Sequence, residues 1–178
     1  MIKILNNFIS KQHQLYFKNV INYNEFPWYL IKGEDQVLTH TLYNYPKGLN
    51  SSYYIEFKII IDALEQKEGI RIIQLLKIRC RKILSIKNKP IPQVSLPDVK
   101  NYKTFIYNVD NCEGDTSFFK ERHSMELPDK HNLTELNPTE NINGDRGTGI
   151  YFDGDIYHTN NFETAIIFDF KIDDNYNN

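Results

Sequence analysis

The spacing of hydrophobic positions separates the chain into one helical stretch and a series of strand-like stretches. Within residues 51–69 apolar side chains recur every four residues, at Ile55, Ile59 and Ala63. This period is typical of an amphipathic α-helix. Ser51 or Ser52 can cap the first turn and Gly69 can end the last one, so the pattern predicts a single helix over this range.

Elsewhere the pattern is that of short β-strands between turns. β-branched residues and alternating polarity predict strands over 26–33, 37–44, 70–86, 103–111, 149–152 and 164–172. Residues 88–101 contain three prolines, which exclude a central strand through the whole segment. We interpret residues 111–119 as a turn, and the polar, aperiodic residues 120–145 as an excursion loop.

This order of elements favours a mainly β (α+β) fold, in which the strands form a sandwich or jelly roll and an N-terminal helix packs outside it. No repeat and no linker divides the chain, whose 178 residues suffice for one hydrophobic core. We therefore expect a single domain over 1–178. Its N-terminal strands and support helix would occupy 1–69, and the jelly-roll core 70–172.

Composition and charge argue against several classes of partner. The formal net charge of −2 gives no electrostatic reason to expect nucleic acid, and no apolar run reaches the roughly 18–20 residues of a membrane span. Lysines and arginines cluster at 77–89, which we interpret as a solvated face of one element. Cys80 and Cys112 are far apart and the N-terminus lacks a secretory signal, so we expect an intracellular protein with reduced thiols.

Two stretches of the chain resemble motifs of a known enzyme family. Residues 103–119 read KTFIYNVDNCEGDTSFF and residues 146–159 read RGTGIYFDGDIYHT. The matched positions of the first are Tyr107, Asn108, Val109, Gly114 and Thr116. Those of the second are Gly147, Ile150, Phe152, Asp153, Gly154 and His158. In order and spacing they resemble virus-encoded 2-oxoglutarate/Fe(II)-dependent oxygenases, the prolyl-hydroxylase-like branch of the double-stranded β-helix superfamily.

The resemblance implies a double-stranded β-helix that holds Fe(II) through two histidines and one carboxylate, with open positions for 2-oxoglutarate and O2. His158 matches the distal histidine. The other two ligands form a His-x-Asp triplet about a dozen residues before the Tyr107 strand, and here Gln93-Val94-Ser95 occupies that place. Gln93 and Ser95 are uncharged, weak donors. We therefore expect no useful binding of Fe(II) by the ordinary triad.

The family also requires a basic residue on the last strand, which binds the distal carboxylate of 2-oxoglutarate. Glu163 or Thr164 occupies the matching place, and Lys171 lies several residues too far along. Tyr107 matches a position that often faces the co-substrate, and is the one cofactor-binding candidate, although it fits a core aromatic better. Two requirements of the family therefore fail in this chain.

Three functions stay open on the sequence. We expect a catalytically degenerate relative without a cofactor, intracellular or virion-associated, that binds a ligand or a protein partner. One alternative is an active 2-oxoglutarate-dependent hydroxylase, which would hold Fe(II) through His158 with Asp98 or a loop histidine. The other is an unrelated jelly-roll structural protein.

The remaining histidines are weaker candidates. We expect His40 to be an ordinary strand residue. His123 and His131 lie eight residues apart in the predicted loop, with Glu121, Glu126 and Asp129 nearby. They form either a second metal site or, more simply, part of a polar, solvated loop.

Overall fold

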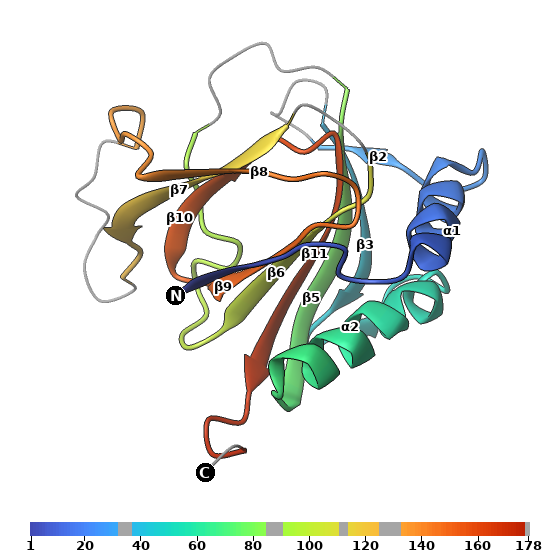
Figure 1. Ribbon diagram of the computed structural model, residues 1–178, viewed down its shortest axis with the longest axis horizontal. Coiled ribbons are helices and arrows are strands. Elements are labelled where there is room, and N and C mark those ends of the chain that lie inside the picture. Colours follow the sequence, from blue (N-terminus) through green and yellow to red (C-terminus); the bar gives the residue numbers. More distant parts are fainter. Residues whose placement is uncertain (32–36, 85–90, 111–113, 125–132, 177–178) are drawn as a thin grey trace.

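The computed structural model describes residues 1–31, 37–84, 91–110, 114–124 and 133–176. Its helices are α1 (Lys11–Asn22) and α2 (Tyr54–Glu68). Its strands are β1 (Ile2–Leu5), β2 (Tyr29–Leu30), β3 (Val37–Asn44), β4 (Gly48–Leu49), β5 (Ile72–Ile83), β6 (Lys103–Asn108), β7 (Asp115–Arg122), β8 (Glu140–Asn143), β9 (Gly149–Asp153), β10 (Ile156–Asn160) and β11 (Thr164–Ile172). Two antiparallel sheets face each other, and both helices pack on the outer face of the larger one (Figure 1).

The strand order is that of a jelly roll. The large sheet runs β1-β9-β6-β11-β5-β3-β2, with β4 on β3, and the small sheet runs β10-β7-β8. Strands β9 and β10 belong to different sheets, and a turn at Gly154 joins them. A Cβ atom at Gly154 would lie 2.1 Å from the ring of Tyr102, so only glycine fits this turn. The expected mainly β fold with a helix outside it is confirmed.

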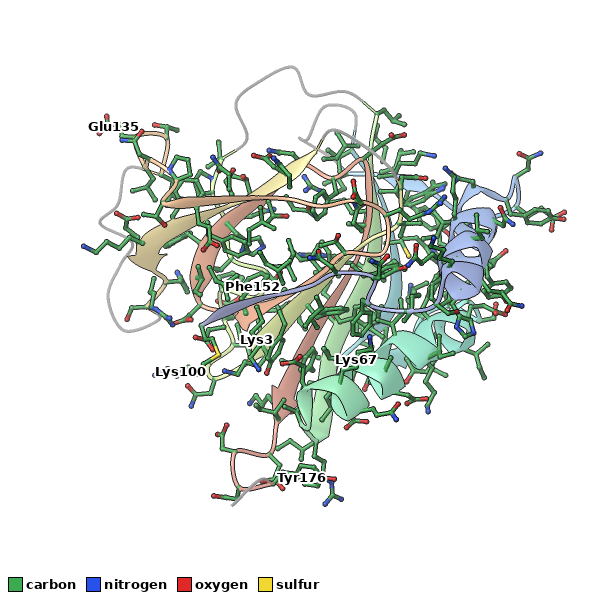
Figure 2. The ribbon with its side chains drawn as sticks, viewed as in Figure 1. Lys3, Lys67, Lys100, Glu135, Phe152 and Tyr176 are labelled. Carbon is green, nitrogen blue, oxygen red and sulfur yellow. The ribbon has the colours of Figure 1, made fainter. Side chains whose placement is uncertain are left out.

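Alternation along the central strands gives the large sheet two different faces. On the outer face, Ile78 and Phe168 join both helices in one apolar cluster. On the inner face, Ile167 joins Phe118 of the small sheet in a second apolar cluster. Figure 2 shows Phe152 in the space between the two sheets, where it belongs to this inner cluster.

Helix α2 confirms the predicted helix, but a different stripe of it faces the sheet. The residues buried against the outer cluster are Phe57, Ile60 and Leu64. Ile55 and Ile59 of the predicted stripe are 72% and 37% exposed. Both stripes are apolar. The buried stripe is the one that carries the large ring of Phe57, which packs on Phe17 of α1 at 5.3 Å between ring centroids.

The ends of the helices also differ from the prediction. The N-cap of α2 is Tyr53, and the hydroxyl of Ser51 accepts a hydrogen bond from the Tyr53 amide at 3.3 Å. Gly69 ends the helix as predicted, with the left-handed φ of 62° that glycine adopts without strain. Helix α1, which the pattern did not predict, begins at the Ser10 cap. Neither helix of the described segments is long and apolar enough to cross a membrane.

The predicted strands are confirmed where apolar and polar residues alternate or apolar residues run on, as in β3, β5, β6 and β11. Of the described residues 26–31, only β2 is strand, and residues 32–33 of that prediction lie outside the described residues. The prediction missed β1, β4, β7, β8 and β10. Strand β7 occupies most of the segment that we interpreted as a turn, and β8 lies inside the predicted excursion loop. Both are paired through the small sheet, and β10 is a polar strand that is buried throughout.

Candidate functional site

His158 and Gln93 lie opposite each other at the edge of the small sheet. Two backbone hydrogen bonds of 3.0 Å join them, because the amide of each residue donates to the carbonyl of the other. Directly opposed residues of an antiparallel pair place their side chains on the same side. The structure therefore brings the sequence-predicted triplet beside His158, with Gln93 exposed at the edge.

The His158 ring lies on the inner side of the small sheet and is only 2% exposed. It packs edge-on against Phe152, with 4.9 Å between ring centroids, and near Phe118 at 6.2 Å. The Nδ1 atom lies 3.0 Å from the carbonyl oxygen of Ile156, which can only accept a hydrogen bond. Nδ1 therefore carries the proton, and Nε2 has the free lone pair.

Burial lowers the pKa of His158 to about 4, because desolvation disfavours the imidazolium form. The hydrogen bond to Ile156 acts in the opposite direction, while the charges of Arg79 and Arg81 lower the pKa further. The side chain is thus neutral at pH 7. It offers a single nitrogen donor.

Ser95, which the motif resemblance matches to the ligand carboxylate, accepts a hydrogen bond from an arginine. The Nη2 atom of Arg79, on β5 of the large sheet, donates a hydrogen bond of 3.1 Å to the Ser95 hydroxyl. Nearby, Asp169 of β11 is fully buried, and its Oδ1 atom accepts a hydrogen bond of 2.8 Å from the Thr104 hydroxyl. Burial raises the pKa of Asp169, and the charge of Arg79 opposes that rise.

These residues do not fit the facial Fe(II) site of two histidines and one carboxylate. His158 supplies one good donor, whereas Gln93 and Ser95 supply only neutral oxygens. Within the described residues, no group of three or more His, Cys, Asp or Glu side chains could hold a metal ion. The positive charge of Arg79, whose Nη2 atom lies 3.1 Å from the Ser95 hydroxyl, would also repel a divalent cation bound there.

The inner face of β5 carries three basic residues. The register partners of Lys77, Arg79 and Arg81 on β11 are Asp169, Ile167 and Ala165. Ile167 and Ala165 belong to the inner cluster, so the three basic side chains share that face. All three are half-buried, and the Nη1 atom of Arg81 donates to the Asn160 carbonyl at 2.6 Å. The prediction of a solvated basic face is therefore wrong for these three residues, and residues 85–89 of that cluster lie outside the described residues.

Tyr107 lies on the other face of the sheet. It is fully buried in the outer cluster, and its ring meets Phe8 and Phe17 edge-on. The sheet itself separates it from His158, so in this structure Tyr107 is a core aromatic and faces no pocket beside His158. Burial raises its pKa well above the ordinary tyrosine range.

The place of the co-substrate's basic residue is also not filled from β11. Glu163 is exposed before the strand begins, and Thr164 pairs with Lys82 on the outer face. The inner positions of β11 include Ala165, Ile167 and Asp169, and Lys171 follows near the end of the strand, where it pairs with Gln74. The neighbouring strand β5 adds three basic side chains to this face.

The other predicted donors do not join His158. Both ring nitrogens of His123 have partners, the Tyr157 hydroxyl at 3.2 Å and the Pro97 carbonyl at 3.0 Å. Asp98 is exposed in the turn between Leu96 and Val99. His131, Glu126 and Asp129 of the second candidate site lie outside the described residues.

His40 is buried on the outer face of β3, beside Cys80 in the register. Aromatic rings surround it, with Phe26 at 5.2 Å and Tyr29 stacked at 5.7 Å. Burial lowers its pKa, and neither ring nitrogen has a hydrogen-bond partner among the described residues. It is a strand residue of the outer layer, as expected.

A polar cavity of about 480 Å³ opens at the Tyr102 end of the inner face, lined among others by Leu96, Tyr102, His123 and Asp153. The carboxylate of Asp153, in the lining of this cavity, already has three cationic partners. Asp153 accepts from Lys103, from Arg122 at 3.3 Å and from the amino group of Met1 at 2.9 Å. Burial alone would raise the pKa of Asp153, but hydrogen bonds from Lys103 and the terminal ammonium lower it below its usual range. In the sequence, this residue was only a matched position of the second motif.

Comparison with known proteins places the fold. Neither a family model nor a curated protein sequence matches the chain. Among solved structures, the α-ketoglutarate-dependent epimerase SnoN of nogalamycin biosynthesis superposes with a TM-score of 0.62 at 9% identity, over 96% of this chain and 78% of that one. HygX from Streptomyces hygroscopicus, with nickel, 2-oxoglutarate and hygromycin B bound, gives 0.61 at 8% identity over 96% and 81%. A 2OG-Fe(II) oxygenase-family oxidoreductase from Burkholderia pseudomallei gives 0.60 at 10% identity over 96% and 83%.

These likenesses show the fold of the chain and no more, since the identities are 8–10%. The chain folds as the double-stranded β-helix of 2-oxoglutarate/Fe(II) oxygenases, as the motif resemblance implied. Gln93 and Ser95, which the motif resemblance matches to two of the three Fe(II) ligands, are not the histidine and carboxylate that an Fe(II) site of this kind requires.

Proposed function

We propose that this protein is a non-catalytic relative of the 2-oxoglutarate/Fe(II) oxygenases, which keeps the double-stranded β-helix and uses the space between its sheets to bind a ligand. A protein partner and an intracellular or virion-associated setting belong to the same proposal. Neither the fold nor the overall charge argues for nucleic acid or a membrane.

The observation that carries the proposal is the contact between Arg79 and Ser95. In an iron site the position of Ser95 needs an anionic oxygen that faces the metal. Here a guanidinium group occupies that side, 3.1 Å from the Ser95 hydroxyl. A cation beside the candidate ligand position opposes metal binding by repulsion, in addition to the lack of suitable donors.

The alternative of an active hydroxylase needs two further donors beside His158. Of those that the sequence suggested, Asp98 is exposed in its turn and His123 is bonded at both nitrogens. Asp169 is a buried carboxyl on the inner face, but Arg79 and Lys77 act on it as cations. No observation on the described residues favours this alternative over the proposal.

The test is anaerobic titration of the purified protein with Fe(II) and 2-oxoglutarate. We expect neither the visible charge-transfer band of the keto-acid chelate nor succinate above the level of free iron, and the same result for His158→Ala. Stoichiometric colour, or succinate production that His158→Ala abolishes, would contradict the proposal. A known oxygenase of the same fold serves as the positive control for both readings.

A further inference from the structure

The inner face of the large sheet carries an excess of positive charge. Lys77, Arg79 and Arg81 project from alternate positions of β5, while Asp169 is the one acidic residue of the described inner face that their register includes. Burial raises the pKa of that carboxyl, which further reduces the negative charge available to the three cations. Three cations spaced two residues apart repel one another unless an anion lies among them.

Two buried hydrogen-bond donors, one on each sheet, have no acceptor among the described residues. The Nε atom of Arg79 is buried and donates to no acceptor among the described residues. The same is true of Nδ2 of Asn160, a side chain that is only 4% exposed. Its Oδ1 atom is occupied, because it accepts from the Phe162 amide at 3.2 Å. A buried donor without an acceptor is destabilising, and its usual explanation is a ligand, water or ion.

The two donors come from opposite sheets, but both are associated with β5. Arg79 belongs to this strand, and Asn160 of β10 contacts its Arg81. Asn160 follows His158 by two residues on β10, and both side chains are on the inner side. The backbone carbonyl of Asn160 accepts from Arg81, the neighbour of Arg79 on that face, at 2.6 Å. Gln93, exposed opposite His158, marks the solvent side of this space.

We propose that the space between the sheets binds a small oxyanion, a carboxylate or phosphate group, through the Nε edge of Arg79 with Asn160 Nδ2 as a further donor. The planar guanidinium edge matches two oxygens of such a group, and the ion pair is desolvated there. Binding would satisfy both unpartnered donors and offset the repulsion among the three cations. The inference rests on the proposed function, because a metal centre at His158 would demand different chemistry in the same space.

The test is calorimetric titration with sodium acetate, succinate and phosphate in the presence of EDTA, against sodium chloride at equal ionic strength. The expected result is saturable binding of at least one oxyanion and none of chloride. The ratio of phosphate to carboxylate affinity then identifies which group the site prefers. EDTA keeps metal out of the measurement.

Two variants locate the binding at the proposed donors. Arg79→Lys keeps the charge and removes the planar edge, and Asn160→Asp keeps the acceptor for the Phe162 amide while it replaces the donor with an anionic oxygen. Each should weaken binding about tenfold or more, as expected for the loss of a charge-assisted hydrogen bond. Arg71→Gln, at an exposed arginine just before β5, should leave binding unchanged.

The outcomes separate this inference from the proposed function. Absence of saturable binding by all three oxyanions, or equal binding by the parent and Asn160→Asp, overturns the oxyanion site. Neither result bears on iron. Iron-dependent succinate formation overturns the proposed function instead, whatever the oxyanion titration gives. Asn160→Asp keeps the test decisive if Arg79→Lys does not fold, because the new carboxylate would lie among arginines and should be tolerated.

Discussion

The two faces of the large sheet are built from the same strands but have different compositions. On the outer face, β5 presents Ile78 and Cys80 to a continuous apolar cluster with the helices. On the inner face, the alternate residues Arg79 and Arg81 point toward the small sheet. Burial of apolar surface explains this outer cluster. It does not explain the inner face, where half-buried cations lower rather than raise stability unless something compensates them.

The difference between the outer and inner faces indicates that a binding function is best sought on the inner face. A face that only had to stabilise the sheet would be filled with side chains such as Ile106 and Ile167, which occupy part of the inner face already. Polar residues such as His158 and Asp169 are retained there at an energetic disadvantage. Buried polar groups of this kind are the usual signature of a binding site.

The largest expected effect comes from truncation on the outer face. Phe57→Ala removes a ring that is 0% exposed and packs on Phe17, and should lower the free energy of unfolding by about 3–5 kcal/mol. Urea denaturation followed by circular dichroism measures it. Ile55→Ala on the same helix, at a residue 72% exposed, is the matched control and should change stability by about 0.5 kcal/mol or less. Reversed magnitudes would show that the sequence-predicted stripe faces the sheet after all.

The next effect tests the inner face through pH. Burial lowers the pKa of His158 from its ordinary 6.5 to about 4 in the folded protein, so below pH 6.5 the unfolded chain binds a proton that the folded chain does not. The stabilisation is complete above pH 6.5 and is lost as the pH falls to 4, by at most about 3 kcal/mol at 1.36 kcal/mol per pKa unit. His158→Gln should flatten the stability–pH curve in this window.

Other groups act on the same curve, so the comparison of parent and variant isolates His158. The buried His40 contributes with the same sign on the outer face, because burial also lowers its pKa. Asp169 contributes with the opposite sign, because its raised pKa favours the folded state as the pH falls. Identical slopes for parent and His158→Gln in EDTA between pH 6.5 and 4 would mean that His158 is solvated in the folded protein.

A smaller effect concerns the metal site that the motif resemblance implies at His158, Gln93 and Ser95. Gln93→His with Ser95→Asp restores the donor types of the triad beside His158, yet Arg79 remains in the ligand position. We expect weak Co(II) binding by this double variant, followed by visible absorption. Addition of Arg79→Gln should raise the affinity by about tenfold or more, which is about 1.4 kcal/mol, because a repulsive charge is removed.

The control adds Arg71→Gln to the same double variant, since this arginine is exposed and outside the inner face. It should leave the Co(II) affinity unchanged. If the double variant alone bound Co(II) as tightly as the triple variant, the Arg79–Ser95 contact would have no influence on metal, and the electrostatic part of the argument would fail.

The fold class could be predicted from the sequence, and the motif resemblance pointed to the Gln93-Val94-Ser95 triplet as a candidate ligand position. Alternation in β3 and β5 and the apolar run of β11 predicted those strands, because side chains on successive strand residues point to opposite faces. The Gly69 stop and the helix before it were likewise local features. The Gln93 triplet could be found because its ligands are two residues apart, a spacing that a strand fixes by itself.

Tertiary structure decided which of two apolar stripes of α2 is buried and which side of β5 faces the ligand space. Local pattern showed that Arg79 and Arg81 share a face, but not whether that face meets water or a second sheet. Strands β7 and β10 show the same limit, since their residues become strand only when they pair with each other. Contacts between residues far apart in the chain, such as Arg79 with Ser95 or Gln93 with His158, depend on closure of the barrel, which no local sequence period encodes.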